Sequence, residues 1–173
     1  MEIIMDNPFE KKKESYPADR IICDKTFDLG QIDVYIEFGI LKDMLFKNCV
    51  IRVGSANLMR IQNCWFQDCV LEEISIYKVD VHDSVFSNCR FFGGSFSKSD
   101  IFNSFLVQCR FSDIIMIDIW CVESFLKDVT FNSETQEWFR PNSILDMIDC
   151  KIWRSDQWVS VPGSCDVREF FNL

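Results

Sequence analysis

The sequence contains little glycine and proline, a single histidine and no long apolar run. Six glycines and four prolines among 173 residues are too few for a collagen-like or low-complexity chain. One histidine and no paired Cys-x-x-Cys units predict that the chain has no zinc site. The most apolar stretch, residues 114–122, is interrupted by Asp118 and is too short to supply the roughly 20 apolar residues that cross a bilayer. No metal site and no membrane span are therefore expected.

Positive charge is also scarce, since 18 lysines and arginines stand against 27 aspartates and glutamates and leave a net charge of −9. Nucleic-acid-binding proteins need clustered cations to displace counterions from phosphate, so direct nucleic-acid binding is not expected. The acidic balance leaves open a basic protein partner, or a surface that imitates DNA. The start of the chain does not resemble a signal peptide, which predicts a cytoplasmic protein whose nine cysteines are reduced.

Phenylalanine is abundant, with 17 copies, and many of them recur at intervals of five residues. From Leu41 to Phe131 every fifth residue is apolar, and the residue two positions before each is uncharged and mostly small. Neither the helical period of 3.6 nor strand alternation produces a strict period of five. A five-residue unit with two inward positions, followed by a corner, does produce it. The central inward positions are Leu41, Phe46, Ile51, Ala56, Ile61, Phe66, Leu71, Ile76, Val81, Phe86, Phe91, Phe96, Ile101, Leu106, Phe111, Met116, Cys121, Leu126 and Phe131.

A second, longer period relates five stretches that are rich in phenylalanine and cysteine. They are 46–51, 66–71, 86–91, 106–111 and 126–131, so each begins four five-residue units after the one before it. Four units per turn of a square coil place these stretches above one another, with adjacent coils about 4.8 Å apart. The sequence therefore predicts an all-β, four-sided β-helix of about five coils over residues 36–132.

This repeat resembles the pentapeptide-repeat family, on the strength of the stretches that combine phenylalanine, a polar residue, cysteine and a second phenylalanine. The resemblance implies a right-handed quadrilateral β-helix. It is loosely similar to the quinolone-resistance branch of the family, whose members bind DNA gyrase by imitating DNA. A protein that works by binding another macromolecule is therefore implied.

The segment before the repeat, residues 1–35, breaks the five-residue register. Residues 1–20 include the run Lys11–Lys13 and predict a loosely attached tail, with a docking site as the alternative for the basic run. Alternating apolar residues over 21–38 predict lead-in strands.

The segment after the repeat, residues 133–173, breaks the register as well. Ser133 and Glu134 begin one predicted short helix, and a second is predicted over 142–150. A stack of repeats exposes an apolar end that needs a cap, so a short mixed α/β cap is expected here. Homodimerisation through the same segment is the alternative.

Cysteine and histidine are the candidates for chemistry, and both are interpreted as structural. Cys49, Cys69, Cys89 and Cys109 recur once in every predicted coil and should pack in one inner corner as small apolar groups, with a thiolate metal ladder as the alternative. His82 lies at an outward position with no serine or cysteine beside it to activate. The chain also lacks a glycine-rich phosphate loop and a nucleophile elbow. No catalytic residue, no metal and no cofactor are therefore expected.

Two outward columns carry acidic residues in alternation with neutral amides. Their acids are Asp43, Asp68, Asp83, Glu123 and Asp128, and their amides are Asn48, Asn63, Asn88, Asn103 and Gln108. Rows of negative charge would suit a DNA mimic, whereas stacked amides are good neighbours on any β surface. The five acids form the candidate acidic face.

The outward slot just before the central residue is apolar on one side of the coil. It contains Leu45, Trp65, Val85, Phe105 and Phe125, and Phe102, Val107 and Val122 widen the stripe. A soluble monomer rarely leaves such a patch in water, so either an end of the chain or a partner covers it. The predicted partner-binding residues are Trp65, Val85, Phe102, Phe105, Val122 and Phe125.

The favoured function is a non-catalytic protein-binding module of the immunity or inhibitor type, which neutralises a protein partner such as a toxin through a rigid face. The alternative is a DNA mimic that binds a gyrase-like enzyme. A coil that serves only as a spacer for the two ends is the third hypothesis.

Overall fold

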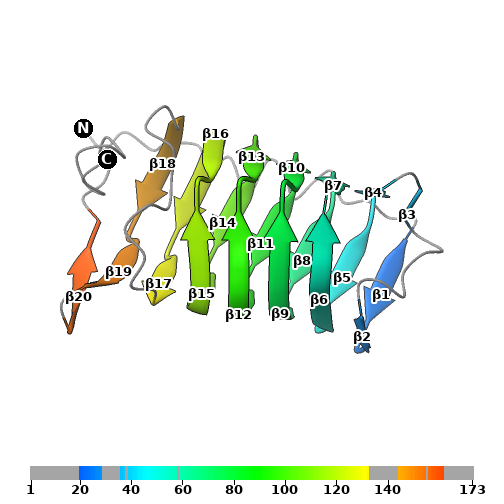
Figure 1. Cartoon of the computed structure of the whole chain (residues 1–173), viewed down its shortest axis with the longest axis horizontal. Coiled ribbons are helices and arrows are strands. Elements are labelled where there is room, and N and C mark those ends of the chain that lie inside the picture. Colours follow the sequence, from blue (N-terminus) through cyan, green and yellow to red (C-terminus); the bar gives the residue numbers. More distant parts are fainter. Residues whose placement is uncertain are drawn as a thin grey trace, which may run out of the picture.

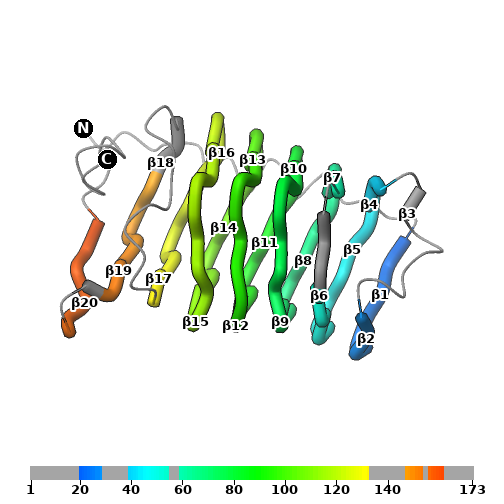
Figure 2. The backbone as a smooth tube through the Cα atoms, in the orientation of Figure 1, coloured from blue at the N-terminus to red at the C-terminus, as the bar shows by residue number. Residues whose placement is uncertain are grey.

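The computed structural model describes residues 20–28, 36–37, 39–57, 59–132, 144–154 and 156–161, and all regular elements among them are β-strands. The strands stack coil upon coil along one axis, from β1 and β2 at one end to β19 and β20 at the other (Figures 1 and 2). This confirms the predicted all-β solenoid of about five coils with turns of about 20 residues.

The strands are β1 (Ile21–Cys23), β2 (Thr26–Asp28), β3 (Ile36–Glu37), β4 (Ile40–Lys42), β5 (Leu45–Lys47), β6 (Val50–Asn57), β7 (Arg60–Gln62), β8 (Trp65–Gln67), β9 (Val70–Tyr77), β10 (Asp80–His82), β11 (Val85–Ser87), β12 (Arg90–Ser97), β13 (Asp100–Phe102), β14 (Phe105–Val107), β15 (Arg110–Ile117), β16 (Trp120–Lys127), β17 (Thr130–Asn132), β18 (Ile144–Ile148), β19 (Lys151–Arg154) and β20 (Gln157–Ser160).

Three parallel rows of strands run along the stack. The β4 row contains β4, β7, β10, β13 and the first part of β16, and the β5 row contains β1, β5, β8, β11, β14, the rest of β16 and β18. The long-strand sheet contains β2, β6, β9, β12, β15, β17 and β19, with β20 added antiparallel at its end. Within the repeat, partners in successive coils are separated by four five-residue units, as in Phe46↔Phe66 and Phe66↔Phe86.

The corners of the coil have a left-handed backbone two residues after most central positions. Asp43, Asn48, Asn63 and Asp68 have φ values of 55°, 52°, 49° and 54°. Asparagine and aspartate tolerate this conformation better than most residues because their short polar side chains bond locally. The recurrence of Asp and Asn in the sequence therefore has a backbone cause at these positions.

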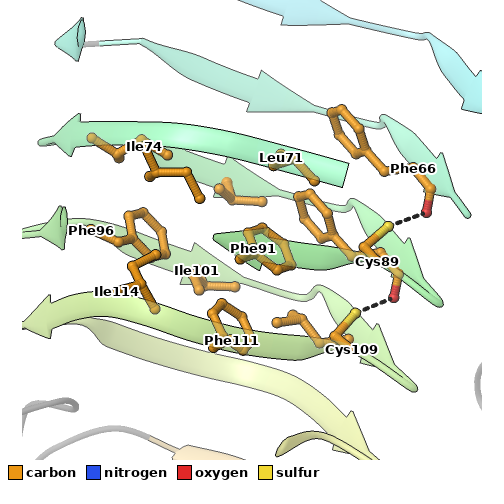
Figure 3. Packing of buried hydrophobic residues seen from close by; sticks show 14 of the residues in the cluster. Phe66, Leu71, Ile74, Cys89, Phe91, Phe96, Ile101, Cys109, Phe111 and Ile114 are labelled. Carbon is orange, nitrogen blue, oxygen red and sulfur yellow. Dashed lines mark hydrogen bonds between the residues drawn. The ribbon is translucent and has the colours of Figure 1, made fainter. Parts of the chain in front are cut away.

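Columns of stacked rings fill the interior, as predicted. The ring centroids of Phe46 and Phe66 are 4.8 Å apart, and those of Phe66 and Phe86 are 4.7 Å apart. Phe91 and Phe111 stack at 4.4 Å in a second column (Figure 3). Each ring therefore covers the next along the axis, which buries large apolar surfaces at every coil.

The cysteine column is bonded to the backbone. The Cys89 thiol reaches the Phe66 carbonyl oxygen at 3.2 Å, and the Cys109 thiol reaches the carbonyl oxygen of Phe86 at 3.3 Å (Figure 3). All eight cysteines within the described residues are free, as expected, and no group of metal-binding side chains occurs in this part of the chain. Packing therefore accounts for the recurrence of cysteine once per coil.

The predicted helix over 142–150 is wrong, because β18 occupies Ile144–Ile148. Met147 and Cys150 are buried, and Asp149 takes the left-handed corner conformation with φ 54°. Cys150 bonds the Leu126 carbonyl oxygen at 3.5 Å, as the other thiols of the column bond the coil before them. Pairing with β16 therefore overrides local helix propensity and continues the stack.

The remaining expectations for the ends are met in part. The predicted lead-in strands are confirmed where β1, β2 and β3 form, and β1 and β2 pair with the first complete coil. The tail 1–19, the residues 29–35 and the helix predicted from Ser133 lie outside the described residues. Within the described ranges, no helix has the length and apolar character needed to span a membrane.

Candidate partner-binding surfaces

One outward slot of the β5 row forms a continuous apolar stripe. Register pairs Leu45 with Trp65, Trp65 with Val85, Val85 with Phe105, and Phe105 with Phe125. These five residues are called the covered stripe below. They form a cluster separate from the interior of the coil, so they lie on the outer side of the row.

The covered stripe is buried although it faces away from the coil. Trp65 is 2% exposed, Val85 0% and Phe105 7%. Among the other predicted partner-binding residues, Phe102, Val122 and Phe125 are half-buried. Thus Trp65, Val85 and Phe105 are closed to solvent, whereas the other three retain some accessible surface.

The long-strand sheet provides an internal control for this burial. Ile115 occupies the same slot relative to its central residue and is 48% exposed, and Arg90 and Arg110 in this slot are exposed as well. The strand geometry therefore does not bury an outward side chain by itself. The covered stripe therefore differs from the long-strand sheet in how much of its outward side chains remains exposed, and its members pack on one another as a cluster of their own.

Aromatic side chains extend the covered stripe onto the β4 row. The Phe102 ring stacks on His82 at 4.8 Å and meets the Trp120 ring edge-on at 5.3 Å. His82 thus packs against an aromatic neighbour. The interactions of the described residues place no serine or cysteine beside its imidazole ring.

The candidate acidic face consists of corner residues linked from coil to coil. The side-chain amides of Asn63, Asn103 and Asn88 donate to the carboxylates of Asp43, Asp83 and Asp68, each at 2.7 Å. A fourth bond of the same length joins Asn48 to Asp24.

These bonds place an amide between successive carboxylates along a corner. Like charges are then two coils apart, about 10 Å, where exposed charges are largely screened. Glu123 and Asp128 also take the left-handed corner conformation. The acidic residues therefore have a structural role in the corners, and imitation of DNA stays a prediction.

A second apolar surface, which the sequence reasoning missed, lies open on the long-strand sheet. Phe92 on β12 lies before the left-handed bend of the long strands, and Tyr77 on β9 and Ile115 and Ile117 on β15 lie after it; together they are called the open face below. Phe92 is 50% exposed and Ile115 48%. Register places Tyr77, Ser97 and Ile117 in one column across the three neighbouring strands. The same five-residue register, applied to the outward slots of this sheet, would have found these residues.

Cations surround the open face. Arg90 and Arg110 are register partners on β12 and β15, and both are exposed. The ammonium groups of Lys78 and Lys98 lie 5.2 Å and 5.6 Å from the centroid of the Tyr77 ring. Acidic residues lie among these cations, since Glu72 is the register partner of Phe92, and Asp113 and Asp118 are close in sequence to Ile115 and Ile117.

Away from these surfaces, the buried thiols of Cys64 and Cys121 are poorly suited to nucleophilic chemistry. Burial raises the pKa of Cys64 to about 12, and burial also raises the pKa of Cys121. Because the thiolate is the nucleophile, these groups stay protonated and inert near neutral pH.

Comparison of the sequence with protein-family models gave no match, and comparison with curated proteins gave none either.

Proposed function

We propose that this chain is a non-catalytic binding protein of the pentapeptide-repeat type, with a right-handed quadrilateral coil, that binds a protein partner through the open face. The repeat type is supported by the five-residue register, the corner at every fifth residue and the pairing of each strand with its equivalent in the next coil. The immunity or inhibitor role rests on the family resemblance and on the absence of recognisable catalytic motifs in the sequence.

The observation that carries the proposal is the exposure of large apolar side chains on three adjacent strands. Tyr77, Phe92, Ile115 and Ile117 keep about two-fifths to one-half of their surface in water. Exposed apolar groups gathered on one face mark interaction sites more often than scattered ones do. Aromatic and arginine side chains are also the residues most enriched in binding hot spots.

The charges around the open face define the chemistry of the partner. Arg90 and Arg110 each present a guanidinium group that suits a bidentate carboxylate. The partner surface is therefore apolar at its centre and carries Asp or Glu at its edge. Because hydrogen-bonded strands hold the open face rigid, little ordering entropy is lost on binding, which suits an inhibitor.

A binding experiment with a matched control tests this proposal. The wild type, the double variant Phe92→Glu/Ile115→Glu and the control Gln62→Glu on the β4 row are used as baits in the native host. The expected partner is captured by the wild type and by the control, and the amount captured by the double variant is at least tenfold lower. This partner is then purified, and its activity is measured with and without the wild-type protein.

Two outcomes would contradict the proposal. Equal capture by the double variant and the control would show that the open face does not bind the partner. If the wild type inhibits the supercoiling of DNA by purified gyrase, and the double variant inhibits it equally, the result would instead favour the DNA-mimic hypothesis.

A further inference from the structure

We propose that Arg90 and Arg110, called the arginine pair below, form a binding site for a phosphomonoester group. The two residues are register partners at the start of β12 and β15, and both side chains are exposed. Adjacent strands lie about 4.8 Å apart, so two positive charges leave the same face of the sheet one coil apart. This inference goes beyond the proposed function and does not rest on it, because a small phosphate compound can occupy the site without a protein partner.

The arginine pair differs from two other arginines of the coil in its register partners. The Arg52 guanidinium lies 3.1 Å from the carboxylate of its register partner Glu72. The Arg60 guanidinium likewise lies 3.6 Å from the carboxylate of its partner Asp80. The two members of the arginine pair face each other instead, and neither forms an ion pair among the described residues. Like charges directly opposite on neighbouring strands are destabilising, so an anion bound between them would remove this repulsion.

Uncharged side chains surround the arginine pair on its own two coils. No acidic residue lies within two positions of either arginine along the chain. The neighbouring outward positions of the two strands and the corners before them hold Phe92, Ser112, Asn88 and Gln108. Thr130 follows in the next coil as the register partner of Arg110. Hydroxyl and amide groups donate hydrogen bonds, so they can complete an oxyanion site around the guanidinium groups.

The acids on adjoining positions are bonded elsewhere or are separated from the arginine pair. Asp68 accepts a side-chain amide bond at 2.7 Å at the corner of the preceding coil, and Glu72 bonds Arg52 at 3.1 Å. Asp113 lies at the left-handed bend of β15, three residues after the second arginine, and Asp128 lies at the corner of the coil that follows. The arginine pair therefore has two cations and no direct counter-ion among these acids.

Charge favours a phosphomonoester over a carboxylate as the ligand. A phosphomonoester carries about −1.5 to −2 charges at neutral pH and has three acceptor oxygens, which match two guanidinium groups that each donate a bidentate pair. A carboxylate carries one charge and leaves one guanidinium uncompensated. Phe92 lies two residues after Arg90 on the same side of β12 and is 50% exposed, so an aromatic group attached to the phosphate can pack on its ring. Phosphotyrosine and a nucleoside monophosphate both have this chemistry.

Calorimetric titration of the full-length chain tests the site with inorganic phosphate, phenyl phosphate and acetate at equal ionic strength. Phenyl phosphate should bind at one site per chain, about tenfold tighter than acetate or better. Arg90→Gln and Arg110→Gln should each weaken this binding by about tenfold or more. The matched control Arg60→Gln removes the same charge from an arginine that has an acidic partner, and it should leave the affinity unchanged.

A variant of the aromatic neighbour tests the second part of the ligand. Phe92→Ala should weaken the binding of phenyl phosphate by about threefold or more and leave that of inorganic phosphate unchanged. Titration with a phosphotyrosine tripeptide and with adenosine monophosphate then distinguishes the sources. Tighter binding of the peptide would support the site and assign the ligand to a phosphorylated protein, and tighter binding of the nucleotide would support the site and assign the ligand to a free metabolite.

Two titration results would overturn the proposal. One is binding of phenyl phosphate no tighter than that of acetate, and the other is an equal loss of affinity in Arg110→Gln and Arg60→Gln, which would indicate a general attraction to positive charge. Thermal unfolding without phosphate checks the variants themselves. Arg110→Gln should melt at or above the wild-type temperature in low salt, because the variant removes a like-charge contact. A lower melting temperature would show that the arginine pair is already neutralised in the free chain, which would also contradict the proposal.

Discussion

The β5 row and the long-strand sheet are built by the same repeat, yet they treat the same outward slot in opposite ways. In the β5 row this slot is apolar along its length and four of its five residues are buried, whereas in the long-strand sheet it holds valine, serine, arginine, threonine and one open isoleucine, none of them buried among the described residues. The backbone geometry is common to both, so it does not determine exposure. The two regions differ instead in the side chains that occupy the slot, which in the β5 row form an apolar cluster of their own.

This contrast separates two kinds of apolar surface. Buried outward residues such as Trp65 contribute to stability as core residues do. Exposed ones such as Phe92 contribute little to folding and remain available for binding. Substitutions in the two regions should therefore affect different properties.

The largest effect is expected at the bend of β12, which shapes the open face. Gly94 has φ 107°, and a Cβ atom there would collide with the Ile74 carbonyl oxygen. Gly94→Ala should lower the free energy of unfolding by about 5 kcal/mol or more, because the clash is with backbone atoms. Gly93→Ala is the matched control, with φ 70° and no atom within 4 Å, and should cost about 1 kcal/mol. Equal costs in urea denaturation would show that the close approach is not a constraint.

The next effect tests the contrast between the two regions directly. Trp65→Ala should lower the free energy of unfolding by about 3–5 kcal/mol, because it empties a packed site. Ile115→Ala, in the equivalent slot, should change it by less than about 0.5 kcal/mol. Chemical denaturation of the two variants measures both values. A cost below about 1 kcal/mol for Trp65→Ala would mean that the covered stripe is not tightly packed.

A smaller effect is expected at the corner between the β4 and β5 rows. Asn63→Asp places a carboxylate between Asp43 and Asp83 and removes a donated bond, so it should cost about 1 kcal/mol at neutral pH. Because these groups are partly exposed, the cost should shrink in 1 M salt. Asn63→Gly keeps the left-handed backbone without adding charge, and its smaller cost should not depend on salt.

The smallest effect is expected inside the coil below the covered stripe. Cys64→Ser should change the free energy of unfolding by less than about 1 kcal/mol, because the same column already accommodates Ser84 and Ser104. The serine hydroxyl can donate to the Gln62 carbonyl oxygen, as the thiol does at 3.3 Å. A cost above about 2 kcal/mol in thermal and urea unfolding would show that sulfur packing is specific at this position.

The sequence was sufficient to predict the coil, because every unit obeys the same spacing and adjacent coils repeat the same inward residues. It was not sufficient at the C-terminal end. Met147 and Ile152 follow Leu126 and Phe131 at a spacing slightly longer than the repeat, so a comparison at the fixed period misses them. The intervening insertion made the region resemble a helix, whereas pairing with the preceding coil determines its structure.

The surfaces were harder to predict than the fold, for a physical reason. Outward slots such as Trp65 and Ile115 are identical in their local pattern, and only their exposure in the folded chain distinguishes them. The role of Asp43 and Asn63 was hidden in the same way, because an acid and an amide become a bonded pair only when two coils are stacked.

The bonded pairs at the corner have a consequence for how such a chain can lengthen or shorten. In the column that begins at Asp43, acid and amide alternate, so one complete structural period covers two coils. Removing a single coil would bring Asp43 directly against Asp83, whereas removing two would restore an acid-to-amide contact. Gene duplications and deletions in this coil should therefore be tolerated best in steps of two coils, and the unit of growth is twice the unit of repetition.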